Sequence, residues 1–282
     1  MTYSRAGVGA VGTGSPRLPP VPNWIEMDGL VNLRDLGGTP LEGGGEVRPG
    51  RLLRSDNLQD LSEADVAELR RRGLSDVIDL RTAYEVNATG DGPLKGDGGV
   101  AHHHFSYFVE QHGEASSPES GDELPEDALP WVGKRLDVEL DDYFASTYWA
   151  YLTDRPESVV GALRAVANAE GAALVHCAAG KDRTGTTVAL ALRLVGADRD
   201  AVVADYAASN ERLPLIVQRL VSSPVYAANL RDRPLASQAT KAETMDTFLR
   251  YLDDAHGGVE AVLARLGWTA ADTDAMRRHL LD

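Results

Sequence analysis

Ten consecutive residues in the second half of the chain constrain its fold more than any other segment. They run from His176 to Gly185 and read HCAAGKDRTG. The segment before them, Ala172 to Val175, is a short apolar run typical of a buried strand, whereas Thr184 to Val195 is apolar nearly all round and typical of a buried helix. These ten residues are therefore expected to connect a central strand to a central helix.

A connection of this kind can bind an anion. Small residues and Gly180 allow successive backbone N–H groups to turn toward one centre, and the following helix adds the positive end of its dipole. Arg183 can donate two parallel hydrogen bonds to an oxyanion. The same positive field stabilises a thiolate, so Cys177 is expected to be a nucleophile at neutral pH.

Two other interpretations of the loop fit less well. A lone cysteine is most often a small buried hydrophobic side chain, but that role needs no glycine, arginine or helix start at these offsets. A Walker-type nucleotide loop also has Gly-Lys between a strand and a helix. Its first glycine would fall at Val175, and the Ser or Thr that holds Mg²⁺ would fall at Asp182. The sequence therefore does not support a nucleotide loop.

Composition excludes further classes. The formal net charge of −15 argues against a nucleic-acid partner, because counterion release requires clustered Lys and Arg. An anionic substrate must be attracted by a local positive field. Cys177 is the only cysteine, so neither an intramolecular disulfide nor a multi-thiolate metal site is expected. No apolar run approaches the roughly 18 residues of a membrane span, so stable membrane insertion is not expected.

One domain is expected after a short leader. Residues 1–22 are rich in Gly and Pro and lack the Leu-rich core of a secretory signal, so they are expected to form a flexible leader. Residues 23–282 are expected to form a single domain. The usage of cysteine favours a cytoplasmic location, while export by a route without a signal peptide stays open.

The rest of the sequence alternates between strand and helix patterns. A helix over 61–72, with Ser62 as its cap, lies between apolar runs at 51–54 and 76–80, which makes a β-α-β unit. Residues 90–137 are expected to be mostly surface loop. Helical patterns continue in the segments 141–152, 157–169, 199–212, 241–255, 258–266 and 270–281. The predicted fold is α/β, with a mainly parallel central sheet flanked by helices and a helical carboxy-terminal portion.

Three adjacent histidines, His102 to His104, suggest a metal site. They lie in a predicted strand over 100–105, where neighbouring side chains point to opposite faces. Three such rings cannot converge on one ion, so no metal site is predicted here.

The spacing Cys-x5-Arg-Thr from Cys177 to Thr184 is the signature of protein tyrosine phosphatases in the broad sense. The full HCAAGKDRTG sequence resembles the bacterial tyrosine phosphatase family that includes the mycobacterial tyrosine phosphatase B and the Listeria lipid phosphatase. Four other segments agree with this family, namely Asn32–Gly38, Arg54–Leu58, Asp79–Arg81 and Asp205–Tyr206. The resemblance covers most of the chain from about residue 23 and implies a cysteine-phosphatase-type fold.

The resemblance also implies roles for the loop residues. Cys177 would form a phosphocysteine intermediate, Arg183 would bind the transferring phosphoryl group, and Thr184 would donate a hydrogen bond to the sulfur. Neither a metal nor another cofactor would be required. The other loop residues would bind the phosphate of the substrate, namely Ala178, Ala179, Gly180, Lys181 and Gly185.

The general acid is less directly indicated. Many tyrosine phosphatases supply it from a Trp-Pro-Asp loop, which this sequence lacks. The resemblance points to Asp182, within the phosphate loop. An alternative is that Asp182 only pairs with a neighbouring arginine and fixes the loop, in which case Asp142 is a reserve candidate. Lys181 either adds a second cation for a phosphoinositide substrate or balances the charge of Asp182.

The expected activity is hydrolysis of phosphomonoesters, with phosphotyrosine in proteins as the leading substrate. A phosphoinositide or inositol phosphate phosphatase with the same loop is one alternative. A non-catalytic phosphate-binding module is disfavoured because Cys177 and Arg183 are both present, and binding alone would not need the thiol. A sulfur-transfer enzyme of rhodanese type also uses a cysteine loop, but it has little use for the run from Lys181 to Thr184. The segment 213–237 is interrupted by prolines and resembles the helical lid of the mycobacterial relative, although ordinary helix packing would also explain it.

Overall fold

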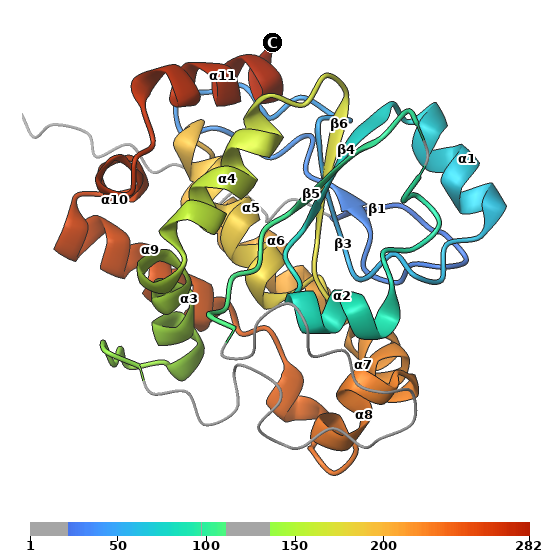
Figure 1. The fold of residues 1–282 in the computed structure, drawn as a ribbon. Helices are drawn as coiled ribbons and strands as arrows, with labels where there is room; N and C mark the ends of the chain where they lie inside the picture. Colours follow the sequence, from blue (N-terminus) through green and yellow to red (C-terminus); the bar gives the residue numbers. More distant parts are fainter. Residues whose placement is uncertain (1–21, 97, 111–135) are drawn as a thin grey trace, which may run out of the picture.

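A computed structural model describes residues 22–96, 98–110 and 136–282. A six-stranded sheet with the strand order β1-β2-β3-β6-β4-β5 forms its centre, and helices cover both faces (Figure 1). The strands are β1 (Asn23–Trp24), β2 (Arg34–Asp35), β3 (Leu52–Ser55), β4 (Leu74–Asp79), β5 (Ala101–His104) and β6 (Ala172–His176). Most of the predicted leader, residues 1–21, lies outside the described residues.

The sheet is mixed but mostly parallel. Strands β3, β6, β4 and β5 run parallel, whereas β1 and β2 pair antiparallel at one edge. In β6, which lies between β3 and β4, every residue is buried, and Val175 pairs with Arg54 on one side and Ile78 on the other. A strand buried on both faces needs a continuous apolar run, which explains why this segment was visible in the sequence. The predicted α/β fold is confirmed.

Helices form the outer layers. They are α1 (Glu63–Arg71), α2 (Ala83–Thr89), α3 (Tyr143–Asp154), α4 (Pro156–Ala167), α5 (Asp182–Leu194), α6 (Arg199–Ala208), α7 (Leu213–Ser222), α8 (Pro224–Leu230), α9 (Ala242–His256), α10 (Val259–Arg265) and α11 (Ala270–Leu281). Short 3₁₀ helices cover Ser209–Arg212 and Leu235–Gln238. The predicted helical carboxy-terminal portion is therefore present.

Two cores lie on the two faces of the sheet. Ala173 and Val175 of β6 face the larger core, which α3, α4, α5 and the carboxy-terminal helices complete. Ala172 and Leu174 face the smaller core, which includes Leu69 of α1. Within the described ranges, no helix has both the length and the apolar character needed to cross a bilayer.

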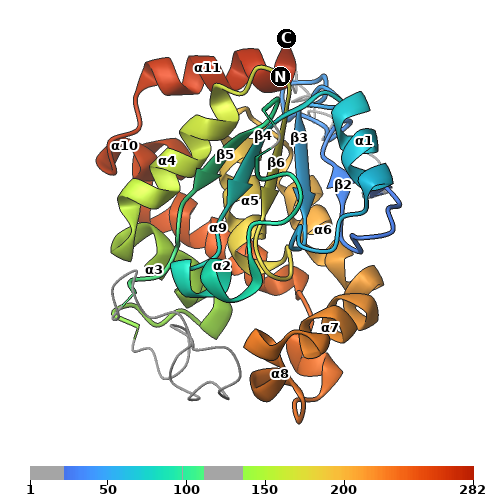
Figure 2. The ribbon, with the colours of Figure 1, turned by 45° about the vertical axis from the view of Figure 1, so that its right-hand side comes forward.

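Helices α7 and α8 lie apart from these layers. Figure 2 shows them as a pair beyond the sheet, on the side where the loop after β6 leads into α5. They form a small cluster of their own with that loop, in which Ile216, Leu220, Val225 and Tyr226 pack against Ala178. The segment 213–237 contains these two short helices because each of them begins with a proline in its first turn, Pro214 in α7 and Pro224 in α8.

Several element boundaries differ from those predicted. Helix α3 starts at Tyr143, later than expected, because Asp142 caps it. Helix α5 starts at Asp182, two residues early. Strands β1 and β2 and helix α2 had no sequence prediction, since elements of two to seven residues show too little periodicity. The part of the predicted loop over 111–135 lies outside the described residues.

The three histidines bond three different partners. The Nε2 atoms of His102 and His104 lie within hydrogen-bond distance of the backbone carbonyls of Leu94 and Arg81, at 2.9 and 2.8 Å. His103 contacts the carboxylate of Asp76 at 2.8 Å. The rings thus serve separate contacts along β5.

Candidate active site

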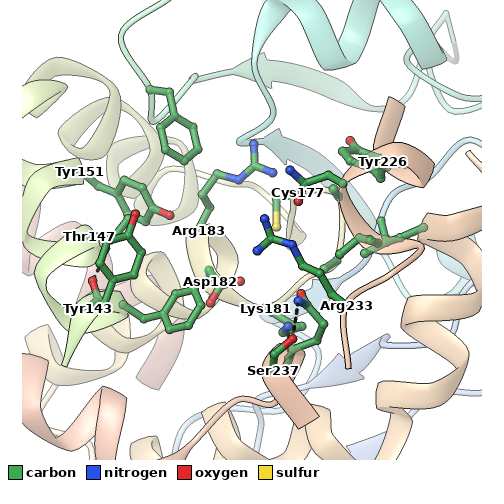
Figure 3. Close-up of a pocket in the computed structure, with 18 residues that line it drawn as sticks. Tyr143, Thr147, Tyr151, Cys177, Lys181, Asp182, Arg183, Tyr226, Arg233 and Ser237 are labelled. Carbon is green, nitrogen blue, oxygen red and sulfur yellow. Dashed lines mark hydrogen bonds between the residues drawn. The ribbon is translucent and has the colours of Figure 1, made fainter. Parts of the chain in front are cut away.

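Strand β6 and helix α5 place the predicted loop at the bottom of a cavity of about 450 Å³. Cys177 follows β6 directly and is only 2% exposed. Figure 3 shows its sulfur in this cavity, with the guanidinium groups of Arg183 and Arg233 turned toward the same space. Six of the predicted site residues line the cavity together, namely Cys177, Ala178, Ala179, Lys181, Asp182 and Arg183.

The carbonyl groups of the loop are held from outside. Asn32 donates from its side chain to the carbonyls of Ala179 and Gly180, at 2.9 and 3.2 Å. Arg54 donates to the carbonyls of Gly180 and Lys181, at 2.8 and 3.3 Å. Because the N–H and C=O of a trans peptide point in opposite directions, the amides that follow these carbonyls point away from Asn32 and Arg54. This orientation is the one that an anion-binding loop requires.

The conformation at Gly180 requires glycine. Its φ is +67°, and a Cβ there would lie 2.4 Å from the carbonyl oxygen of Ser55. Position 185 favours glycine for a different reason, since a Cβ there would lie 2.8 Å from the ring of Tyr206. Gly185 packs within α5 and is not part of the cavity lining, so its role as a phosphate contact stays a prediction.

Behind the loop, a buried ion cluster joins three of the segments noted in the sequence. Arg34 and Arg54 both pair with the carboxylate of Asp205, at 2.7 and 2.5 Å. Both arginines are almost completely buried, and these two charges hold the pKa of Asp205 below its ordinary value against the opposing effect of burial. Since Arg54 also holds the loop carbonyls, this cluster connects α6 to the phosphate loop.

Arg183 forms a two-point ion pair with Glu85 of α2. Its Nη1 and Nη2 lie 2.6 and 2.9 Å from the two carboxylate oxygens. Burial lowers the pKa of Arg183, but the carboxylate of Glu85 outweighs burial and raises it well above the ordinary value. Arg183 therefore stays charged. Glu85 was missed in the sequence, although the pattern from Thr82 to Glu85 is that of a helix capping box, which the structure contains.

Asp182 accepts a hydrogen bond from a buried phenol. The hydroxyl of Tyr148 lies 2.5 Å from Oδ1 of Asp182, and the hydroxyl of Tyr206 lies 2.6 Å from that of Tyr148. Burial and the charge of Asp182 raise the pKa of Tyr148 well above its ordinary value, so the phenol stays a donor. Among the described residues no ion pair joins Asp182 to an arginine. The alternative in which Asp182 only fixes the loop through an arginine therefore has no contact to support it.

Asp142, the reserve candidate, has a structural position. One of its oxygens accepts from the backbone N–H of Ala145 at 2.9 Å and caps α3, while the other accepts from the hydroxyl of Thr244 at 3.0 Å. Asp142 does not line the cavity. Asp142 thus joins the start of α3 to Thr244 of α9, and both of its carboxylate oxygens are used in these contacts.

His176 and Thr184 flank the cavity-lining residues. The ring of His176 lies 3.7 Å from the carboxylate of Asp79, and burial lowers the pKa of His176 to about 4, so it is neutral at physiological pH. Asp79 itself pairs with Arg81 at 2.5 Å. The hydroxyl of Thr184 is buried and has no hydrogen-bond partner within the described ranges. A bond from Thr184 to the sulfur stays a prediction.

Opposite walls of the cavity differ in character. Lys181 donates from its ammonium group to the backbone carbonyl of Gln238, which ties the loop to the segment after α8. One wall comes from α7, α8 and the residues after them: Leu220, Tyr226, Asn229, Leu230, Arg233, Ser237 and Gln238. The other wall is largely aromatic and comprises Phe108, Tyr143, Phe144, Thr147 and Tyr151.

A mostly parallel sheet whose central strand leads to a buried cysteine in the loop before a helix is the architecture of the cysteine phosphatases. Residues 25–282 match the model of the tyrosine phosphatase family. The chain therefore belongs to this family and is a phosphatase, as the loop sequence indicated.

Two relatives support the assignment. The chain is 32% identical over 287 residues to the triple specificity protein phosphatase PtpB of Mycobacterium tuberculosis, an alignment that covers 91% of this chain and 98% of the relative. It is 28% identical over 261 residues to a protein of Cupriavidus necator whose name assigns it to the tyrosine-protein phosphatases, with coverage of 91% and 88%.

Proposed function

We propose that the protein hydrolyses phosphomonoesters through a phosphocysteine intermediate on Cys177, with phosphotyrosine in proteins as the leading substrate. The observation that carries this proposal is the position of Cys177 at the bottom of a cavity that also contains the ion-paired Arg183. A cation held in place can stabilise the charge of the transferring phosphoryl group, and a thiolate can attack the phosphorus.

The reaction has two steps. In the first, the thiolate of Cys177 attacks phosphorus, the bond from phosphorus to the leaving oxygen breaks, and Asp182 gives that oxygen a proton. In the second, water attacks the phosphocysteine, the phosphorus–sulfur bond breaks, and the carboxylate of Asp182 takes a proton from the water. Thr184 would stabilise the thiolate that leaves. Supporting this assignment of Asp182, its side chain lines the same cavity as Cys177.

The aromatic wall favours an aryl phosphate. Phe108, Tyr143 and Tyr151 line the same cavity as Cys177, and a phenyl ring can pack against them. Figure 3 shows Tyr143 and Tyr151 on the side opposite Tyr226 and Arg233. The name of the mycobacterial relative states triple specificity for that protein. For this chain we propose phosphotyrosine as the leading substrate.

We also infer a cytoplasmic location for the protein, because its one cysteine fits a reducing compartment.

A phosphoinositide or inositol phosphate is the second candidate substrate. Lys181 and Arg233 bring two further cations to the cavity besides Arg183, which suits a substrate with more than one phosphate.

Both candidate substrates would enter past the segment 213–237. We infer that this segment, with α7 and α8, is a lid, because it forms one wall of the cavity and packs in a small cluster of its own.

A phosphate-release panel tests the proposed function. Phosphopeptides carrying phosphotyrosine, phosphoserine or phosphothreonine are compared with phosphoinositides, and Cys177→Ser is the control. We expect release from phosphotyrosine and none from the control. Activity that survives in Cys177→Ser would overturn the mechanism, whereas vanadate binding without turnover on any substrate would indicate a binding module.

The role of Asp182 needs its own comparison. Asp182→Asn should slow hydrolysis of an alkyl phosphate by roughly 10²- to 10⁴-fold, and it should slow an activated aryl phosphate less, because a good leaving group needs little protonation. Unchanged rates on both substrates would remove Asp182 from the mechanism.

A further inference from the structure

The carboxylate that holds Arg183 also binds a residue of α8. The hydroxyl of Tyr226 donates to Oε1 of Glu85 at 2.8 Å, and Nη2 of Arg183 donates to the same oxygen at 2.9 Å. Oε2 of Glu85 is used on the other side, where it accepts from Arg183 at 2.6 Å and from the backbone N–H of Thr82 at 2.8 Å. One buried carboxylate thus joins three elements, namely α2, α5 and α8.

Water has little access to this arrangement. Glu85, Arg183 and Tyr226 are 0%, 6% and 4% exposed. In such surroundings a hydrogen bond is strong, and a lost donor is not readily replaced by solvent. Loss of the Tyr226 hydroxyl would therefore leave Oε1 of Glu85 with fewer donors and leave the carboxylate less firmly oriented.

Helices α7 and α8 are attached to the body of the protein in different ways. Arg219 of α7 donates to the side chains of Asp56, Asn57 and Asp60, at 2.6, 2.9 and 3.0 Å. Among the described side chains, α8 contacts the body through apolar packing in the small cluster and through the bond from Tyr226 to Glu85. The position of α8 is therefore coupled to the body through the carboxylate that orients Arg183.

We propose that Tyr226 is a positioning residue for Arg183 that acts through Glu85. When α8 is seated, Tyr226 fixes the carboxylate, and the carboxylate fixes the guanidinium for the phosphoryl group. When α8 moves away, Glu85 loses one donor and Arg183 loses part of its alignment. This inference rests on the proposed function, in which Arg183 binds the transferring phosphoryl group, and it makes productive phosphate binding dependent on the position of α8.

The experiment compares two phenol deletions. Tyr226→Phe removes the hydroxyl that binds Glu85. Tyr84→Phe is the matched control, because Tyr84 packs against the same cluster and its buried hydroxyl has no hydrogen-bond partner within the part of the chain that the structure describes. For each variant, kcat and KM on an aryl phosphate, the Kd for vanadate and the melting temperature are measured.

We expect Tyr226→Phe to lower kcat and to raise the Kd for vanadate, each by roughly tenfold, as for the loss of a hydrogen bond to a charged group. KM should change less, and Tyr84→Phe should match the wild type in both constants. A merely structural role for Tyr226 would lower the melting temperature and leave the Kd for vanadate unchanged. That result, or wild-type constants in Tyr226→Phe, would overturn the inference.

A double variant tests whether Tyr226 acts on the Kd for vanadate through Arg183. In Arg183→Lys the two-point ion pair is gone but the charge remains, so Tyr226→Phe should there have little further effect on the Kd for vanadate. A full tenfold effect in this background would mean that Tyr226 contacts the ligand itself and would overturn the positioning role. If the wild type binds vanadate but hydrolyses none of the substrates, the proposed function fails while this comparison still stands. If the wild type binds no vanadate, both fail.

Discussion

The hydroxyl of Tyr148 donates a hydrogen bond of 2.5 Å to Oδ1 of Asp182. A phenol has a single hydrogen, so the contact of 2.6 Å between Tyr206 and Tyr148 must be donated by Tyr206. Oδ1 of Asp182 is therefore occupied as an acceptor. A proton carried by Asp182 would then be on Oδ2, which gives the proposed general acid a defined orientation.

Removal of this phenol should affect the protonation of the leaving group. We expect Tyr148→Phe to lower kcat on an alkyl phosphate by roughly tenfold, with a smaller effect on an aryl phosphate that has a good leaving group. Tyr107→Phe is the control, because Tyr107 is also buried and its hydroxyl contacts Thr187 at 2.7 Å, whereas no hydrogen bond among the described residues joins it to Asp182. Equal losses in the two variants would contradict a role specific to Tyr148.

Gly180 should be irreplaceable for a reason that another glycine does not share. Gly180→Ala adds a Cβ 2.4 Å from the carbonyl oxygen of Ser55, at a φ of +67°. We expect activity to fall by at least ~100-fold, because the loop amides lose their common orientation. Gly196 also has a positive φ, of +84°, but a Cβ there would meet nothing within 4 Å.

The matched variant Gly196→Ala should therefore cost only backbone strain, about 1–2 kcal/mol of unfolding free energy, with normal kcat. Urea unfolding and steady-state kinetics on both variants measure the two effects. Normal turnover in Gly180→Ala would show that the loop does not need the conformation described above.

Stability should decrease in mild acid because of His176. Burial lowers its pKa in the folded protein to about 4, whereas the unfolded chain has the ordinary value of 6.5. Below pH 6.5 the unfolded state binds a proton that the folded state does not bind, so the free energy of unfolding falls as the pH decreases toward 4. No such loss occurs above pH 7. At pH 5 the expected loss is about 2 kcal/mol.

Urea unfolding at pH 7 and pH 5 checks this prediction. His176→Asn lacks the titrating ring, so the decrease between the two pH values should be smaller than in the wild type by about 2 kcal/mol. The same decrease in both proteins would contradict the assignment of a neutral, buried His176.

Vanadate should protect part of the proposed lid against hydrogen exchange. We expect slower exchange over residues 224–238, which carry Tyr226 and the carbonyl that Lys181 binds. Exchange in α7 should change less, because Arg219 already anchors that helix to three side chains. Unchanged exchange over 224–238, measured with and without vanadate by mass spectrometry, would count against a lid.

The sequence predicted those parts of the fold and site that are local in the chain. Strand β6, the loop and helix α5 are contiguous, so an apolar run, a glycine and an arginine at fixed offsets were sufficient to locate them. Asp182 was singled out by the resemblance to the family, and it belongs to the same contiguous segment.

The partners of these residues could not be predicted, because they are distant in sequence. Glu85 is 98 positions from Arg183, Tyr148 is 34 from Asp182, and Tyr226 is 141 from Glu85. A lone Glu or Tyr carries no periodic signal for such a contact. A capping box such as that from Thr82 to Glu85 marks only the start of a helix, so it gives no reason to bring α2 to the phosphate loop.

The nucleophile is the central claim, and a trapping experiment tests it most directly. The enzyme is mixed with an aryl phosphate, quenched with acid during turnover and digested for mass spectrometry. The proposed mechanism predicts one phosphoryl group on the peptide that contains Cys177, and neither adduct nor turnover in Cys177→Ser. Turnover in Cys177→Ser at the wild-type rate, with no phosphorylated Cys177 in the wild type, would contradict it.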